Sequence, residues 1–334
     1  MVGGMRDPRL LAAPGCVGVY HLCSRIVDKR FVIKQREKVR FMELARGGAA
    51  FAGVELLSWC VMDNHFHLLV RVSPVDAESL DDEEVFRRIG ELYSPNKCSY
   101  LRGVWQRCGD AKSRARFLAP YRRRMGNLSD FMKTLKQRFS QWYNLRKGRE
   151  GTLWEGRFRS VLLEHSNGDQ GLGPLVRFVA GYIDLNPVRA RMVARSEQSP
   201  WNAFGSAVRG DDLALSGLKL LWGERLTRRL GEDGLIDRHR QMLDKDEPLG
   251  SMLERQGGAR SAGNAQPDRE TASAESLTGA QPSVDRHAIP ELPPNSRMSR
   301  YCPEISRARF LGQPRNRLLG RRSPATDPRA SGSD

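Results

Sequence analysis

Two histidines separated by one residue are the strongest candidates for chemistry in this sequence. The segment His65-Phe66-His67 lies in a β-rich run, and side chains two residues apart on a strand point to the same face. Two imidazoles would then project together, and neutral imidazole is a ligand for several divalent metal ions. The alternative is a pair of histidines that only hydrogen-bond within a half-buried sheet, which is the more common case for an isolated His-x-His.

A second candidate is Tyr182, which is followed four residues later by Asn186 and then by Pro187. A helix that begins at Pro174 would place Tyr182 and Asn186 on one face, one turn apart. The phenol and the amide oxygen would then reach the same point. The alternative is that Tyr182 belongs to an apolar core stripe and that Asn186-Pro187 ends the helix. The spacing alone does not choose between the two.

Basic and aromatic residues accumulate between these two motifs. Positive charges follow phosphate groups and aromatic rings stack on unpaired bases, so the mixture is typical of proteins that bind single-stranded nucleic acid. Trp154 lies in a loop flanked by glycines and is the candidate for base stacking, whereas Trp142 falls on the apolar stripe of a predicted helix. The basic candidates are Lys133, Lys136, Arg138, Arg146, Arg157 and Arg159.

The charge balance indicates a polyanionic partner. Lysine and arginine number 55 against 39 acidic residues, a formal net charge of +16, and nucleic acid is the leading candidate. A basic surface that only keeps the protein soluble is the alternative. No apolar run approaches the roughly 20 residues that span a bilayer, the N-terminus does not resemble a signal peptide, and the six cysteines show no zinc-site spacing. We therefore expect a cytoplasmic protein with reduced thiols.

The elements that must position these residues are strands and helices in mixed order, with hairpin connections available. This pattern favours an α+β domain with an antiparallel sheet. The predicted strands are residues 17–25, 54–62, 65–72 and 157–164, and the predicted helices are residues 35–46, 81–93, 129–144 and one that begins at Pro174.

The expected helix ends and one expected loop depend on few residues. Gly47-Gly48 is expected to stop the helix of residues 35–46, and Ser129 is expected to cap a later helix. Residues 94–124 show no clear period and are expected to form an irregular, basic excursion.

Four stretches, in this order along the chain, resemble the single-tyrosine HUH transposases, and within them the group associated with repetitive palindromic elements. The resemblance covers residues 14–207. The matching stretches are GVYHL at 18–22 with Arg25, VMDNHFHLLV at 61–70, GTLWEGRFRS at 151–160 and YIDLNPVRA at 182–190.

This resemblance implies a ferredoxin-like αβ sandwich with the two histidines on a central strand. It makes His65 and His67 metal ligands, Asn186 a third ligand and Tyr182 a nucleophile that forms a 5′-phosphotyrosine intermediate. The implied partners are Mg²⁺ or Mn²⁺, single-stranded or hairpin DNA, and a second copy of the chain. Arg25 and Arg189 lie in the matching stretches and join the DNA-binding candidates.

Two other functions would use the same residues. A replication-initiation or conjugative nickase shares the chemistry, but the motifs around Trp154 and Tyr182 favour a transposase. A DNA-binding protein that has lost catalysis, or that has been adapted by its host, would keep the basic face without needing an intact His-x-His.

The chain divides into three predicted parts. Residues 14–207 form the catalytic domain, and residues 208–249 form a helical extension of it. From residue 250 to 334 the sequence is rich in Gly, Ser, Pro, Ala and Arg. A segment of this composition buries too little apolar surface to offset its ordering entropy, so we expect a disordered basic tail.

Overall fold

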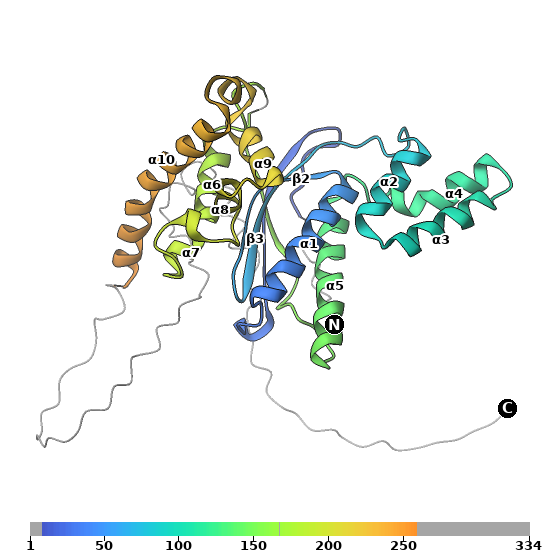
Figure 1. Cartoon of the computed structure of the whole chain (residues 1–334), viewed down its shortest axis with the longest axis horizontal. Helices are drawn as coiled ribbons and strands as arrows, with labels where there is room; N and C mark the ends of the chain where they lie inside the picture. Colours follow the sequence, from blue (N-terminus) through green and yellow to red (C-terminus); the bar gives the residue numbers. More distant parts are fainter. Residues whose placement is uncertain (1–8, 167, 259–334) are drawn as a thin grey trace, which may run out of the picture.

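A four-stranded antiparallel sheet forms the centre of the protein (Figure 1). The computed structural model describes residues 9–166 and 168–258, with side chains up to residue 245. The strands lie in the order β2-β3-β1-β4, and each of the four predicted strands is present. Their bounds are β1 (Gly18–Arg25), β2 (Val54–Val61), β3 (His65–Val72) and β4 (Arg159–Leu163).

One face of the sheet is covered by α1 (Gln35–Ala52) and α5 (Leu128–Lys147) (Figure 1). The sequence β1-α1-β2-β3-α5-β4, with its strand order, is the ferredoxin-like arrangement, so the predicted α+β fold is confirmed. Beyond α1 and α5 lies a second group of helices, namely α2 (Asp82–Leu92), α3 (Pro95–Gln106) and α4 (Ala111–Arg122).

The opposite face is covered by the helices that follow β4 (Figure 1). They are α6 (Pro174–Asp184), α7 (Asn186–Arg189), α8 (Ala203–Val208), α9 (Asp212–Trp222) and α10 (Glu224–Gly258). The first residues of the predicted tail, 250–258, belong to α10, and the remainder of that tail lies outside the described residues. Within the described ranges, no helix combines the length and apolar composition needed to cross a membrane.

The alternation of side chains in β3 separates two hydrophobic cores. Phe66, Leu68 and Val70 are fully buried on the face that packs against α1 and α5. Leu69 points the other way, into a core that contains Tyr182 and the apolar residues of α6 and α9. Because successive strand residues alternate between faces, His65 and His67 are directed toward the α6 layer.

Residues 94–124 are helical, so the predicted irregular excursion is wrong. Ser94 accepts a hydrogen bond from the backbone N–H of Lys97 at the start of α3, and Asp110 accepts one from Ser113 at 2.8 Å at the start of α4. Leu101 in α3 and Leu118 in α4 are among the few residues that these helices bury. A narrow apolar stripe gives little periodicity, and the caps were the stronger signal in the sequence.

Helix α1 continues through Gly47-Gly48 to Ala52 and ends at Gly53, which has a left-handed φ of 68°. The prediction that Gly47-Gly48 stops the helix is therefore wrong. A Cβ on Gly47 would lie 2.4 Å from the carbonyl oxygen of Glu91. The missing side chain thus allows α1 and α2 to approach closely, a contact between elements far apart in the sequence.

The cap of α5 also differs from the prediction. The Oδ1 atom of Asn127 accepts a hydrogen bond from the backbone N–H of Asp130 at 3.0 Å, so the cap of α5 lies two residues before the predicted one. The hydroxyl of Ser129 instead accepts from the guanidinium of Arg9 at 3.2 Å.

The carboxylate of Asp184 ties the end of α6 to its neighbours. Its Oδ2 atom accepts from Nε2 of His239 at 3.1 Å, and its Oδ1 atom accepts from the Ser58 hydroxyl and the Phe204 backbone N–H at 3.3 and 3.1 Å. The indole N–H of Trp222 donates to Nδ1 of His239 at 3.3 Å, so Nε2 is the protonated nitrogen of that ring. Asp184 and His239 are almost completely buried.

The same residue is held through its backbone. The carbonyl oxygen of Asp184 accepts from the Ser196 hydroxyl at 2.7 Å and from the Asn202 amide at 2.8 Å. Asp184 lies two residues after Tyr182 and two before Asn186. Its contacts with β2, α8 and α10 therefore set the position of both candidate residues.

We expect Gly47→Ala to destabilise the protein because the added methyl group meets the Glu91 carbonyl. Overpacking of this kind costs about 1–3 kcal/mol. Gly90→Ala is the matched control, because Gly90 is helical and its Cβ would meet nothing within 4 Å, so a gain of up to about 1 kcal/mol is expected. Urea denaturation measures both. Similar changes in the free energy of unfolding for the two variants would contradict the close approach of α1 and α2.

Asp184→Ala should lower the free energy of unfolding by about 3–5 kcal/mol, since it leaves three buried donors without their acceptor. Asp237→Ala removes an exposed ion pair with Arg240 from α10 and should change stability by less than about 0.5 kcal/mol. If Asp184→Ala does not fold, Asp184→Asn replaces it in the same denaturation series, and its free energy of unfolding should be lowered by a smaller amount. Stability unchanged in Asp184→Asn and Asp184→Ala would refute the anchoring role.

Candidate active site

The two histidines of the His-x-His motif lie side by side on β3. Both are buried, with 1% of His65 and 2% of His67 exposed, and their ring centroids are 5.1 Å apart with the rings perpendicular. A third imidazole comes from β1, where the ring of His21 meets that of His67 edge to edge, with 5.1 Å between centroids and 24° between planes. Three imidazoles from two neighbouring strands therefore gather on one face of the sheet.

The hydrogen bonds of His65 determine which of its nitrogens carries the proton. Nδ1 of His65 lies 2.6 Å from Oδ1 of Asn64, and the Asn64 amide N–H donates to the Lys29 carbonyl at 3.1 Å. Because that amide oxygen can only accept, Nδ1 of His65 donates to it. The Nε2 atom then bears the lone pair that could bind a metal ion.

The hydrogen bond of His67 is made to another ring. Its Nδ1 atom lies 2.9 Å from Nε2 of His21, and its own Nε2 atom is buried without a hydrogen-bond partner in the described part of the chain. Burial lowers the pKa of His21 to about 4. Burial, together with the charges of His21, His65 and Arg25, holds the pKa of His67 well below its usual value. His21 and His67 are therefore neutral at pH 7, as metal-binding imidazoles must be.

These contacts suit a metal site that is completed by another kind of donor. Both His65 and His67 have Nδ1 engaged within the protein, the arrangement that orients histidine ligands. Across the described residues, no three His, Cys, Asp or Glu side chains form a metal-binding group. A metal held by the two histidines would need a further ligand of another type, such as an amide oxygen.

Helix α6 brings Tyr182 to the histidines. Its ring meets those of His67 and His21 edge-on, with centroids 6.0 and 6.3 Å apart, and 7% of the residue is exposed. The tyrosine and the His-x-His motif, more than one hundred residues apart in the sequence, thus share one site.

Asn186 does not continue the helix of Tyr182, so the prediction of one helix through both residues is wrong. Helix α6 ends at Asp184, because Pro187 has no N–H to donate to the carbonyl of Ile183. The Asn186 amide N–H donates instead to the carbonyls of Tyr182 and Ile183 at 2.9 and 3.4 Å. Asn186 remains directly beside Tyr182, and its amide nitrogen is hydrogen-bonded to the backbone.

Arg189 also contacts Tyr182. Its Nη1 atom donates to the Tyr182 carbonyl at 3.1 Å, and its guanidinium carbon lies 4.9 Å from the centre of the phenol ring. The predicted DNA-binding residue therefore places a positive charge against the predicted nucleophile.

The remaining basic candidates fall into two groups. Lys136 donates to the Gly156 carbonyl at 2.7 Å, and burial lowers its pKa to about 8, while Arg138 packs over the ring of Tyr93. These two side chains have structural contacts. Arg25 is partly exposed, and the exposed candidates are Lys133, Arg146, Arg157 and Arg159.

Strand pairing connects part of the exposed group with the histidines. Cys23 of β1 pairs with His67 on one side and with Arg159 of β4 on the other, and Arg25 pairs with His65. Paired residues of neighbouring strands share a face. Arg25 and Arg159 thus lie on the same face as the two histidines.

Trp154 is a core residue, so its predicted role in base stacking is wrong. Only 6% of it is exposed, its indole N–H donates to the Lys136 carbonyl at 3.1 Å, and its ring packs against Phe66 and Phe139. An isolated bridge between Trp154 and Ile26 draws the loop onto the end of the sheet. The flanking glycines indicated a loop but not the direction of the side chain.

His21 was not among the predicted site residues. The alternation of Val19, His21 and Cys23 places it on one face of β1, but only the pairing of β1 with β3 brings that face to His67.

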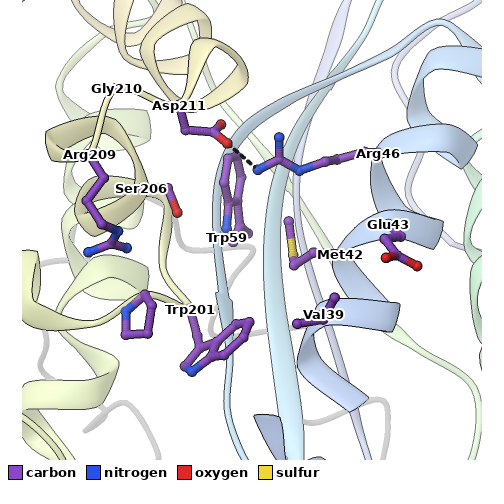
Figure 2. Close-up of a pocket in the computed structure, with 11 residues that line it drawn as sticks. Val39, Met42, Glu43, Arg46, Trp59, Trp201, Ser206, Arg209, Gly210 and Asp211 are labelled. Atoms are coloured by element: carbon purple, nitrogen blue, oxygen red, sulfur yellow. Dashed lines mark hydrogen bonds and ion pairs between the residues drawn. The ribbon is translucent and has the colours of Figure 1, made fainter. Parts of the chain in front are cut away.

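A hollow in the described part of the chain lies elsewhere, between α1 and the segment 200–211 (Figure 2). It has a volume of about 450 Å³ and contains Trp59 and Trp201 in its lining. The Arg46–Asp211 ion pair of 2.7 Å crosses it, and Glu43 pairs with Arg40. Arg209, which also lines it, donates to the backbone carbonyls of Glu197 and Ser199. The hollow contains none of the predicted site residues.

Comparison with known proteins gives a match for the part of the chain that carries the histidines. Residues 17–79, which include His21, His65 and His67, match the family model described as IS200-like transposase. A solved structure of a REP-associated tyrosine transposase bound to a REP hairpin is 15% identical, covers 61% of this chain and 86% of that chain, and has a TM-score of 0.37. No curated protein matches. Over residues 17–79 the chain is similar to the IS200-like transposases, which confirms the resemblance indicated by its motifs.

Proposed function

We propose that this protein is a metal-dependent tyrosine transposase that cleaves and rejoins single-stranded or hairpin DNA. The observation that carries the proposal is the edge-on contact of Tyr182 with His67, since the proposed nucleophile would then stand beside the proposed metal ligands. The match of residues 17–79 to the IS200-like transposases supports the same activity.

The metal ligands would be Nε2 of His65, Nε2 of His67 and the amide oxygen of Asn186. The amide nitrogen of Asn186 is held by two backbone carbonyls, so its oxygen is the end left for another partner. A bound Mg²⁺ or Mn²⁺ would polarise the scissile phosphate and offset the charge of the transition state.

The nucleophile would be the phenol oxygen of Tyr182. It attacks the phosphorus atom, loses its proton, and forms a bond to phosphorus as the bond to the 3′-oxygen breaks, while the departing 3′-oxygen takes up a proton. The products are a 5′-phosphotyrosine and a free 3′-hydroxyl. A free phenol has a pKa of about 10, so the attacking anion needs stabilisation. The Arg189 guanidinium, 4.9 Å from the centre of the Tyr182 ring, would contribute positive charge there.

Rejoining reverses these steps. A 3′-hydroxyl attacks the phosphotyrosine, restores a phosphodiester and releases Tyr182. The bound strand would follow Arg25 and Arg159, which share the face of the histidines, and Arg157, which is exposed just before β4, would be a further phosphate contact.

Cleavage should require both histidines. His65→Ala and His67→Ala are each expected to reduce cleavage of a labelled hairpin oligonucleotide at least about 100-fold, because each orients the same metal, while DNA affinity stays close to that of the unmodified protein. Addition of EDTA should have the same effect, reversed by Mg²⁺ or Mn²⁺. His165→Ala is the control, because His165 lies beyond β4 and contacts the Leu163 carbonyl, and it should cleave normally. Normal cleavage by either site variant would exclude the metal assignment.

The covalent intermediate should form on Tyr182. Tyr143 is the matched control, because it is equally buried but packs against Phe139 in the other core. Mass spectrometry of the trapped adduct should find DNA on the peptide that contains Tyr182, in the unmodified protein and in Tyr143→Phe, and none in Tyr182→Phe. An adduct that persists in Tyr182→Phe would assign the nucleophile to another residue.

A further inference from the structure

The third imidazole of the site has a role that can be read from its hydrogen bond. We propose that His21 is a positioning residue that accepts the Nδ1–H of His67 and thereby keeps the Nε2 lone pair of His67 available for the metal ion. The inference rests on the proposed metal site. It assigns to His21 a function in preparing that site before metal or DNA binds.

The direction of the hydrogen bond decides whether His67 can be a ligand. Nδ1 of His67 and Nε2 of His21 are 2.9 Å apart, so one of the two atoms carries the shared hydrogen. If His21 donated, neutral His67 would carry its proton on Nε2, which is buried with no acceptor in the described part of the chain. If His67 donates, its Nε2 is a bare lone pair, as a ligand requires.

The geometry shows that His21 acts through His67 and not as a ligand itself. Its Nε2 atom meets the Nδ1 edge of the His67 ring, and the Nδ1 and Nε2 lone pairs of one imidazole diverge. A metal ion on Nε2 of His67 would therefore lie away from the His21 nitrogen. The hydrogen bond, made between nearly coplanar rings whose centroids are 5.1 Å apart, also restricts rotation of His67 about its side-chain bonds.

The two ligands of the proposed site are prepared in parallel ways. Asn64 accepts the Nδ1–H of His65 and is itself held by the Lys29 carbonyl. His21 would do the same for His67 from the neighbouring strand. Partners of this kind typically change metal affinity by about 10- to 100-fold when they are removed.

The first test uses the metal-free, full-length protein. Long-range ¹H–¹⁵N NMR spectra report which nitrogen of each imidazole is protonated, without any requirement for activity. His67 should be protonated on Nδ1 in the unmodified protein. In His21→Phe it should shift toward protonation on Nε2, and in His21→Gln, whose side-chain oxygen can accept, it should remain on Nδ1. Protonation of His67 on Nε2 in the unmodified protein would overturn the proposal without recourse to any variant.

The second test measures Mn²⁺ binding by calorimetry on the same proteins. His21→Phe should bind Mn²⁺ about 10- to 100-fold more weakly, His21→Gln should lie within about threefold of the unmodified protein, and His165→Phe should bind normally. Equal affinity of the unmodified protein and folded His21→Phe would overturn the role of His21 alone. An unmodified protein that does not bind Mn²⁺ would instead overturn the proposed metal site, and this inference with it.

Discussion

The position of the candidate nucleophile depends on one buried carboxylate. Removing a charged group from water is costly unless hydrogen bonds replace the lost hydration, and Asp184 has bonds from Ser58, Phe204 and His239. These donors come from β2, α8 and α10. The end of α6 is therefore held against the sheet by elements before and after it, and Tyr182 is carried to the histidines. The helices that follow α6 are thus part of the support of the site.

Strand β3 combines a structural and a chemical task because its side chains alternate. Phe66, Leu68 and Val70 fill the core beneath α1 and α5, while His65 and His67 face the second helical layer. Burial there favours the neutral imidazole, which is the form that binds metal ions. Burial of the two histidines therefore favours the protonation state that the proposed metal site requires.

The basic side chains have more than one role in the folded chain, because several of them make structural contacts. Lys136 and Arg138 pack against aromatic rings, and Arg122 binds two backbone carbonyls and Asp82. A long side chain with a charged end can cover apolar surface and satisfy carbonyls at the same time. Exposure and strand pairing distinguish these residues from Arg159, which is exposed on the face of the two histidines and remains a candidate for phosphate binding.

The features that the sequence determined by itself are those set by local periodicity and capping. The strands, the common face of His65 and His67, and the start of α6 at Pro174 follow from neighbours within a few residues. The tertiary structure decided the contacts between distant segments. It buried Trp154, joined His21 to His67, and set Gly47 against Glu91. Such contacts depend on strand pairing and helix packing. These bring together residues that are far apart in the sequence, and the local sequence around each residue does not indicate its distant partner.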